Sequence, residues 1–220
     1  MTISQQRLDS LNCVLGLDCS RYQQSIYWNK AYASGIRFAY IKVTEGSTGY
    51  EGTVLNLKAR ALSAQGNKIK VGYYHFARPG FIATPEDDAM AEILNIQNHL
   101  SLLPTAGLPL ALDLEAYSTK DIWSEHPDHM DRFINTFITN FPSVIIYSNK
   151  SFLQDNTALS YGAYPLWIAA YLNNPEVSLP SIPIEWSEWK IWQFTDKGQV
   201  DGYNGDIDLN IMKKDFFNQF

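Results

Sequence analysis

Two acidic side chains, Asp113 and Glu115, stand two residues apart at the end of a short apolar run. Side chains at positions i and i+2 of a strand point to the same side, and the strand rise places their Cα atoms roughly 6.6 Å apart. Two such carboxyl groups can act as a proton donor and an ionised partner if their surroundings separate their pKa values. The alternative is that one of them caps the following helix or pairs with a basic neighbour.

Two further acids stand at comparable places. Asp18 follows the apolar run of residues 14–17, and Asp208 follows an Asn204-Gly205 turn near the C-terminus. Each by itself is typical of a turn or cap residue. If their strands are neighbours in a closed barrel, four acids gather at one mouth, and crowding of like charge raises at least one pKa. This is the requirement for acid-catalysed cleavage of a glycosidic bond.

Aromatic side chains near the ends of apolar runs are candidates for binding a flat ligand face. Trp167, Ala169 and Tyr171 alternate, so they share one face of a strand, and the small residue leaves room between two rings. Tyr74 and Tyr147 occupy similar places in other runs. The alternative for Trp167 is a position in the barrel core.

Polar residues outside the acids suggest less specific roles. The Gln193 amide could bind a substrate acetamido group or satisfy buried backbone. His126 and His129 have the i, i+3 spacing of one helix face, but zinc needs a third and a fourth ligand of known type, so we expect a solvated helix start and no metal. His75 could face the cleft or be a hydrogen-bonded structural residue. No nucleophile elbow or phosphate loop is present in the sequence.

Eight short apolar runs, four to seven residues each, predict eight strands that must position these residues. They are Val14–Asp18, Phe38–Lys42, Lys70–Phe76, Pro109–Asp113, Val144–Tyr147, Leu166–Ala169, Lys190–Phe194 and Ile207–Leu209.

Four segments between the early runs are helical in pattern: Trp28–Ser34, Thr53–Gln65, Pro85–Leu103 and Pro127–Thr139. Strands that alternate with helices predict a parallel sheet, and eight of them favour a closed (β/α)8-type barrel, with its active site at the C-terminal ends of the strands. The connections after Tyr147 are short or Pro-rich. We therefore expect an α/β fold, an irregular TIM-like barrel with reduced later helices, with residues 1–12 as an N-terminal extension and residues 13–220 as a single catalytic domain.

The composition narrows the range of partners. The 220-residue chain has a net charge of −6, and 14% of its residues are aromatic. Nucleic-acid binding draws on Lys and Arg, so a polynucleotide partner is not expected, and no uncharged segment suits membrane insertion. Cys13 and Cys19 flank a predicted strand at roughly 20 Å, too far for a disulfide, and we expect free buried thiols.

The chain resembles glycoside hydrolase family 25, the bacterial and phage type of lysozyme, from about Val14 to its end. The resemblance depends on short motifs that occur in family order. These are Gly16–Ser20, Lys42–Gly46, Gly72–Phe76, Leu112–Glu115, Ile146–Asn149, Leu166–Tyr171, Ile191–Thr195 and Asp206–Asn210. Cys19 departs from the family pattern, where an aliphatic residue is usual.

The resemblance implies a modified α/β barrel without a cofactor that hydrolyses the β-1,4 bond after N-acetylmuramic acid in peptidoglycan, with net retention. Glu115 matches the proton donor, and Asp18, Asp113 and Asp208 match the other acids of the cleft. Either a covalent intermediate or attack by the 2-acetamido group remains open. In the second case Asp113 would orient that group.

Two rival functions remain: a glucosaminidase, which would expose the other reducing sugar, and a barrel that binds glycan without cutting it. Four clustered acids argue against the second, and the missing ligand set disfavours a zinc amidase. We expect a monomer that acts on the bacterial cell wall. Residues 1–11 lack the pattern of a secretory signal, so export by lysis, a pore or a dedicated secretion system is expected. Phage lysin, secreted effector and autolysin all stay open.

Overall fold

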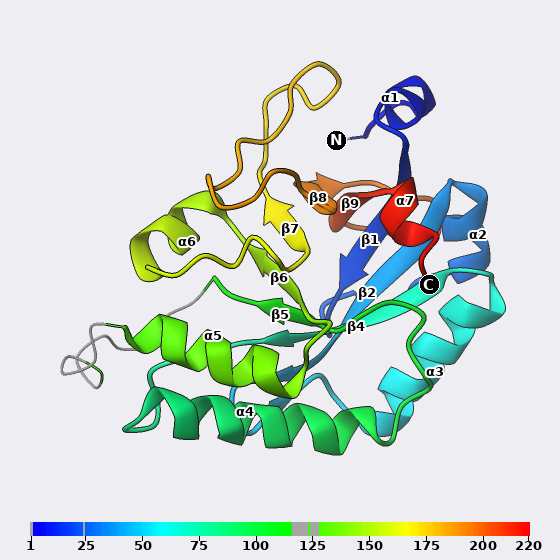
Figure 1. The fold of residues 1–220 in the computed structure, drawn as a ribbon. Helices are drawn as coiled ribbons and strands as arrows, with labels where there is room; N and C mark the ends of the chain where they lie inside the picture. The colour runs from blue at the N-terminus through cyan, green and yellow to red at the C-terminus, as the bar shows by residue number, and fades with distance from the viewer. Residues whose placement is uncertain (1, 24, 116–122, 124–127) are drawn as a thin grey trace.

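The computed structural model describes all residues except 1, 24, 116–122 and 124–127. Its centre is a closed eight-stranded barrel surrounded by helices (Figure 1). The barrel strands are β1 (Cys13–Cys19), β2 (Ile36–Glu45), β4 (Lys70–Phe76), β5 (Ala111–Asp113), β6 (Ile145–Ser148), β7 (Leu166–Ala169), β8 (Ile191–Gly198) and β9 (Ile207–Lys213). The barrel closes because β1 pairs with both β2 and β9, and a short strand, β3 (Gly49–Tyr50), pairs with the end of β2. All eight predicted strands are therefore confirmed.

The last barrel strand runs in the opposite direction to the others. The pairs from β1 to β8 around the barrel are parallel, whereas β9 is antiparallel to both β8 and β1. The prediction of a parallel sheet is thus wrong for β9. A parallel crossover needs a dozen or more residues, and residues 199–206 are too few, so the chain turns back instead. The N-terminal end of β9 consequently lies at the mouth where the other strands end.

The long helices cover only part of the barrel. Four helices lie between the early strands, namely α2 (Trp28–Ala33), α3 (Val54–Gly66), α4 (Pro85–Leu100) and α5 (His129–Asn140). After β6 only α6 (Lys150–Asn156) and α7 (Lys214–Phe217) follow, and β7 and β8 are joined by a long loop (Figure 1). The predicted reduction of the later helices is confirmed. None of the described helices combines the length and the apolar character that a membrane crossing requires.

Local sequence signals explain where the predicted helices begin. The Thr53 hydroxyl accepts a hydrogen bond from the Asn56 amide at the start of α3, and Thr84 caps α4 through the Asp87 amide, with Pro85 in the first turn. The predicted start of the α5 segment at Pro127 lies outside the described residues, and the helix begins at His129.

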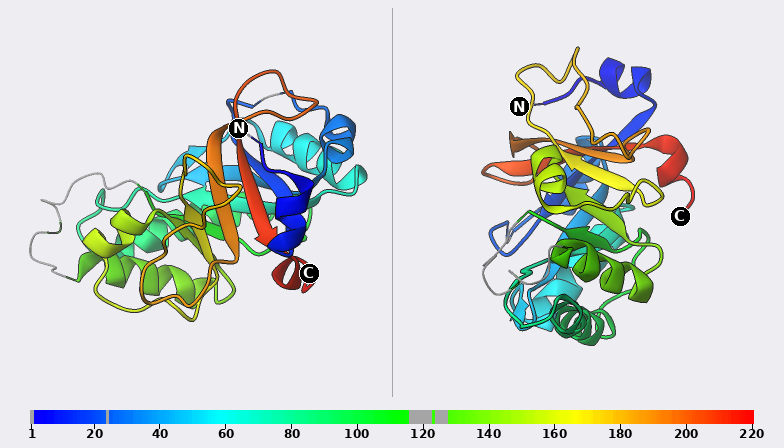
Figure 2. Two further views of the ribbon diagram at one scale, coloured as in Figure 1. Left: turned by 90° about the horizontal axis from the view of Figure 1, so that it is seen from above. Right: turned by 60° about the vertical axis from the view of Figure 1, so that its left-hand side comes forward.

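The N-terminal extension contains a helix that the sequence analysis did not predict, α1 (Gln5–Ser10). The Ser4 amide and hydroxyl donate to the Glu176 carboxylate at 2.6 and 2.8 Å, and the Arg7 guanidinium donates to the Pro175 carbonyl. Leu8 is buried in the core. The extension is therefore fastened to the loop between β7 and β8, and Figure 2 shows it near that loop in both views.

Side chains fill the inside of the barrel. Phe38 and Tyr40 on β2 are fully buried, and glycines on the neighbouring strands make room for their rings. A Cβ atom at Gly16 would lie 2.4 Å from the Phe38 ring, and one at Gly72 would lie 2.3 Å from the Tyr40 ring. The Trp167 ring packs on Tyr40 with 4.7 Å between ring centroids. The interior is thus a packed floor, which leaves space for a ligand only at the mouth.

The two cysteines are buried and unbonded to each other, as expected from their positions at opposite ends of β1. Burial raises the pKa of the Cys13 thiol to about 11 and that of the Cys19 thiol to about 12. Both thiols are therefore protonated and unreactive near neutral pH.

Candidate active site

A pocket of about 140 Å³ opens at the mouth of the barrel, over the ends of the strands. All four acids singled out from the sequence line it, together with three of the predicted aromatic residues and Gln193. The lining residues are Asp18, Ser20, Lys42, Tyr74, Phe76, Asp113, Glu115, Tyr147, Trp167, Gln193 and Asp208. Residues from distant parts of the chain are brought together because the strand ends meet at one mouth.

The acids of the fourth barrel strand differ in exposure. Asp113 is the last residue of β5 and is 5% exposed, whereas Glu115 lies two residues beyond it and is accessible to solvent. Both line the same pocket, as the i, i+2 spacing predicts. A buried carboxyl group and an exposed one therefore face the same pocket.

Asp113 has one carboxyl oxygen without a partner. Its Oδ1 is buried and has no hydrogen-bond partner among the described residues. Burial, followed by the charge of Glu115, raises the pKa of Asp113 well above its usual range, and the Lys42 ammonium opposes this shift. Leaving a buried oxygen unpaired costs free energy, so this atom is suited to receive a hydrogen bond from a ligand.

Glu115 has the properties of a proton donor. Although the residue is exposed, the protein around its carboxyl group removes enough water to raise its pKa above the ordinary value. The hydroxyl of Tyr147, 3.5 Å from Glu115 Oε2, and the charges of Lys42 and Arg78 oppose this shift. A carboxyl group that keeps its proton longer than usual, and that faces an open pocket, can protonate a leaving oxygen.

Asp18 and Asp208 form a coupled pair across the barrel seam. They are register partners on the antiparallel strands β1 and β9. Burial and the Asp208 charge raise the pKa of Asp18 well above its usual range. Burial also raises the pKa of Asp208 to about 6, while a hydrogen bond from Asp18 lowers it. The pair therefore holds one proton on Asp18 and one negative charge on Asp208 near neutral pH.

Gln193 connects the pair to two tyrosines. Its amide nitrogen donates to Asp18 Oδ2 at 2.9 Å, and its amide oxygen accepts from the hydroxyls of Tyr147 and Tyr171 at 2.9 and 2.8 Å. These partners are side chains and not buried backbone, while binding of a substrate acetamido group by Gln193, which lines the pocket, stays a prediction. Because its oxygen already has two donors, Gln193 acts as a positioning residue for its neighbours.

The predicted aromatic residues occupy three different depths. Trp167 is 2% exposed, and its ring packs on Tyr40 and Tyr147 as part of the core that forms the pocket floor. Tyr74 is partly buried in the pocket wall. Tyr171 lies past the end of β7, and with an exposed fraction of 53% it stands at the rim. Only Tyr171 therefore presents a largely open ring.

Three polar residues of the site, Ser20, Asn210 and Lys42, were not predicted from the sequence. Asn210 donates from Nδ2 to Asp18 Oδ2 at 2.7 Å and accepts from the Trp167 indole at 2.8 Å. Lys42 lines the pocket between Phe76 and the acids. A signal was available for Lys42, because it is a charged residue at an inward position of the apolar strand β2, in phase with Phe38 and Tyr40.

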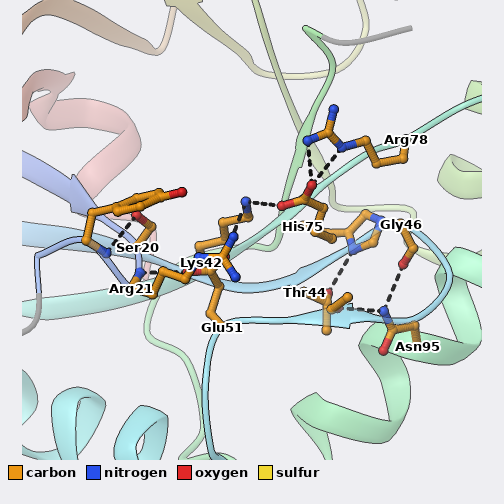
Figure 3. Close-up of polar contacts among 12 residues, drawn as sticks. Ser20, Arg21, Lys42, Thr44, Gly46, Glu51, His75, Arg78 and Asn95 are labelled. Atoms are coloured by element: carbon orange, nitrogen blue, oxygen red, sulfur yellow. Dashed lines mark hydrogen bonds and ion pairs between the residues drawn. The ribbon is translucent and has the colours of Figure 1, made fainter. Parts of the chain in front are cut away.

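Lys42 is held by two carboxylates within a network of ion pairs. Its ammonium group lies 2.6 Å from Glu45 Oε2 and 3.3 Å from Glu51 Oε1. The Arg78 guanidinium pairs with the other oxygen of Glu45, and the Arg21 amide donates to Glu51 (Figure 3). The side chain of Lys42 is 11% exposed, so this network fixes a positive charge beside Asp113 and Glu115.

The histidines have structural surroundings. The His75 ring is fully buried, with Nδ1 2.8 Å from the Thr44 hydroxyl and Nε2 2.6 Å from Glu92 Oε2. His126 lies outside the described residues, and His129 packs against the Trp123 ring. Among the described residues no group of three or more potential ligands is suited to a metal ion.

Comparison with known proteins agrees with this geometry. Residues 17–203 match the profile of glycosyl hydrolases family 25. The chain belongs to this family. It is therefore a glycoside hydrolase, and the match includes Asp18, Asp113 and Glu115, while Asp208 lies just beyond its end.

Several relatives of this family 25 enzyme have names that state an enzymatic activity. It is 31% identical to lysozyme M1 of Streptomyces globisporus, over 90% of this chain and 67% of that protein. It is also 31% identical to N,O-diacetylmuramidase of a Chalaropsis species, over 90% and 95% of the two chains. The crystal structure of the bacterial lysozyme from Streptomyces coelicolor superposes with a TM-score of 0.73 and 28% identity, over 90% and 91% of the chains.

Proposed function

We propose that this family 25 enzyme is a lysozyme that hydrolyses the β-1,4 bond between N-acetylmuramic acid and N-acetylglucosamine in bacterial peptidoglycan. The names of the relatives support this substrate, and the pocket supports the chemistry. The observation that carries the proposal is that one small pocket holds an exposed carboxyl group with a raised pKa, on Glu115, and a buried unpaired carboxyl oxygen, on Asp113.

Glu115 supplies the proton in the first step. Its carboxyl group donates to the glycosidic oxygen, so that the bond from this oxygen to C1 of the muramic acid can break. The raised pKa keeps a fraction of Glu115 protonated closer to neutral pH than an ordinary glutamate would allow.

Asp113 orients the 2-acetamido group that attacks C1. The buried Oδ1 atom accepts the acetamido N–H, which gives this oxygen the partner that it otherwise lacks. The acetamido carbonyl oxygen then forms a bond to C1 while the bond to the leaving oxygen breaks. The positive charge of the resulting oxazolinium ring favours the ionised form of the Asp113 carboxyl group beside it, and the Lys42 ammonium acts in the same direction, against the burial that raises the pKa of Asp113.

The second step returns the enzyme to its starting state. Glu115, now ionised, takes a proton from water as the water oxygen attacks C1, and the bond between C1 and the acetamido oxygen breaks. Two inversions at C1 give net retention. Asp208 adds a negative charge that favours the positive charge developing at the sugar ring, and Tyr74, Tyr147, Trp167 and Tyr171 bound the space for the sugar.

The reducing-end sugar of the released fragments tests this function. Purified sacculi are digested, and the fragments are identified by mass spectrometry after borohydride reduction. A muramidase releases fragments that end in reduced N-acetylmuramic acid. Fragments that end in reduced N-acetylglucosamine would identify the glucosaminidase, and no release by folded protein at any pH would identify a non-catalytic glycan-binding barrel.

The role of the acetamido group has its own test. Glycan strands that have been de-N-acetylated at muramic acid lack the attacking oxygen, and we expect the rate on them to fall by several orders of magnitude. We also expect Asp113→Asn to lower the rate on acetylated strands while changing the rate on de-N-acetylated strands little. An equal loss on both substrates, or a trapped glycosyl-enzyme ester detected by mass spectrometry, would favour the covalent mechanism.

Other properties follow from the same proposal. We infer that the enzyme works as a monomer, without a cofactor, at the bacterial cell wall. We also propose residues 13–220 as the catalytic unit. Sedimentation at working concentration tests the monomer, and dialysis against EDTA should change neither the rate nor the melting temperature.

A further inference from the structure

A second, larger cavity lies beside the catalytic pocket. Its volume is about 580 Å³, and the turn from Glu45 to Glu51 forms one side of it. Arg21, Arg78 and Phe81 complete the lining. Cavities of this size accept ligands larger than a single sugar ring. The mechanism proposed above uses none of this space.

The two cavities share a wall. Phe76 and Lys42 line the catalytic pocket, and the Lys42 ammonium and the Arg78 guanidinium both lie over the Phe76 ring, each 4.5 Å from its centroid. The two carboxylates that bind Lys42, on Glu45 and Glu51, line the larger cavity. A substrate whose sugar occupies the catalytic pocket therefore has the larger cavity directly next to it.

The lining of the larger cavity carries two guanidinium groups and two carboxylates. Its two carboxylates are already paired, because Glu45 bridges Lys42 and Arg78, and the buried Glu51 accepts from Lys42 and from the Arg21 amide. By contrast, the Arg21 guanidinium forms no ion pair with a carboxylate of the described residues; it lies over the ring of Tyr22 at 5.5 Å, and the charge of Glu51 acts on it from beyond ion-pair distance. Figure 3 shows Arg21 and Arg78 on opposite sides of Lys42. A guanidinium is suited to bind a carboxylate in a bidentate manner.

The rest of the lining is suited to a peptide. Tyr50 and Phe81 are 55% and 62% exposed and present open aromatic faces. The Tyr50 ring is held in place by stacking on His99 at 5.6 Å between centroids. Apolar faces together with an available guanidinium match a short peptide that has small side chains and free carboxylates.

We propose that this cavity binds the carboxylate-bearing peptide attached to the muramic acid of the substrate, with Arg21 as the residue that pairs with a peptide carboxylate. This proposal rests on the proposed function, because it concerns the same substrate. It predicts that the enzyme distinguishes peptide-bearing glycan from bare glycan, a preference that the acids of the catalytic pocket cannot provide.

The test compares two soluble substrates, glycan strands with their peptides and the same strands after an amidase has removed the peptides. For Arg21→Gln we expect kcat/KM on peptide-bearing strands to fall about tenfold, the effect of losing one charge-assisted contact. On bare strands we expect no change. The backbone N–H of residue 21 still donates its hydrogen bond to the Glu51 carboxylate after this substitution. We therefore expect the fold to be retained, and the melting temperature checks this.

Lys58→Gln provides the matched control, because it removes one positive charge from an exposed position of α3 outside the cavity lining. It should leave both substrates unaffected. An equal loss on both substrates for Arg21→Gln would mean that Arg21 contacts the glycan or the fold, and no loss on either would mean that no peptide binds there. Either result overturns the proposal.

A binding measurement separates this proposal from the proposed function. A disaccharide tetrapeptide and the same disaccharide without peptide are titrated calorimetrically into wild-type protein and Arg21→Gln. We expect the peptide to strengthen binding to the wild type, and Arg21→Gln to remove that gain. If wild-type protein cuts neither substrate, the muramidase function fails, but this titration still decides the peptide site. Equal binding of the two ligands to the wild type would contradict it.

Discussion

Asp18 and Asp208 face each other across the seam of the barrel as register partners of β1 and β9. Only the reversed direction of β9 allows this, since Asp208 is the second residue of its strand whereas Asp18 is the last but one of its own. The side-chain amides of Gln193 and Asn210 donate hydrogen bonds to Asp18 Oδ2. Because both amides are neutral, they do not compensate the negative charge of two carboxylates. The pair therefore keeps a proton, and its charge state can be tested by substitution.

Asp208→Asn should lower the maximum rate and move the alkaline limb of the pH–rate profile to lower pH. Asp208 and Glu115 repel each other as carboxylates, and this repulsion is reciprocal. Removing the charge at Asp208 therefore lowers the pKa of Glu115, and the catalytic proton is lost at lower pH. A kcat/KM profile of the folded variant measures the limb, and a limb that stays in place or rises would show that the two groups do not interact.

Asp208→Asn should also change how stability depends on pH. The folded pKa of Asp208 is about 6, above the unfolded value near 3.8, so the folded state binds this proton more tightly. The free energy of unfolding of the wild type therefore decreases as pH rises from about 4 to 6, by up to about 3 kcal/mol from this group. In Asp208→Asn the free energy of unfolding does not show this decrease, because an asparagine does not titrate.

Melting temperatures at pH 4 and pH 7 measure the effect. The difference between variant and wild type should be more positive at pH 7 than at pH 4. Asp206→Asn is the control, because that exposed residue on the preceding turn bonds only the Gln199 side chain within the described part of the chain. If the melting temperatures of Asp208→Asn and wild type differed by the same amount at both pH values, burial would not raise the pKa of the Asp208 carboxyl group.

The strands and the early helices that cover part of the barrel can be predicted from the sequence, because their signals lie within a few neighbouring residues. Buried parallel strands are short apolar runs, and the helices α3 and α4 begin at threonine caps that can be recognised from the residues alone. The direction of β9 depends instead on whether residues 199–206 are long enough for a parallel crossover connection from β8. This can be judged only when the order of the strands in the barrel is known. The short helices α1, α6 and α7 give little periodic signal, and α2, which is no longer than α1, was predicted because Gly35 marks its end.

The candidate site is predictable to the same extent. A single acid at the end of an apolar run is common, and these acids stand out only as a set of four, all of which line one pocket. The contacts that set their protonation are not visible in the sequence. Asn210 and Asp18 are 192 positions apart, and only closure of the barrel brings them within hydrogen-bond distance. The sequence equally does not show that the Gln193 oxygen is occupied by two tyrosine hydroxyls.

Glu115→Gln should abolish lysis without unfolding the protein. The amide has the size of the carboxyl group but cannot donate the proton to the leaving oxygen, and removal of a general acid costs about 10²–10⁴ in rate. Glu115 is exposed, and among the described residues its side chain accepts only the long hydrogen bond from the Tyr147 hydroxyl, so the melting temperature should change little. Turbidity clearing of sacculi measures the rate. Glu185→Gln, at an exposed site outside the pocket, is the matched control, and near wild-type clearing by folded Glu115→Gln would remove Glu115 from its role.

Gln193→Leu should cost both stability and activity, because it removes the partner of three buried or partly buried groups. Asp18 loses one of its amide donors, and the hydroxyls of Tyr147 and Tyr171 lose their acceptor. Each unpaired buried group costs about 1–3 kcal/mol, so the free energy of unfolding should fall by at least that amount. The pKa of Asp18 should rise further, because the bond from Gln193 lowers it in the wild type.

A double-mutant cycle tests whether the three groups act as one unit. In Tyr171→Phe the hydroxyl is already absent, so adding Gln193→Leu should cost less than it does in the wild type, with a coupling of about 0.5–3 kcal/mol measured by denaturant unfolding. Gln199→Leu serves as the control. Gln199 is an exposed glutamine just after β8, and Asp206 is the one described residue that its side chain bonds. Additive costs in the cycle would mean that Gln193 fills space without linking Asp18 to the tyrosines. Coupling would instead show that one amide sets both the rim of the pocket and the proton held by the acids at its base.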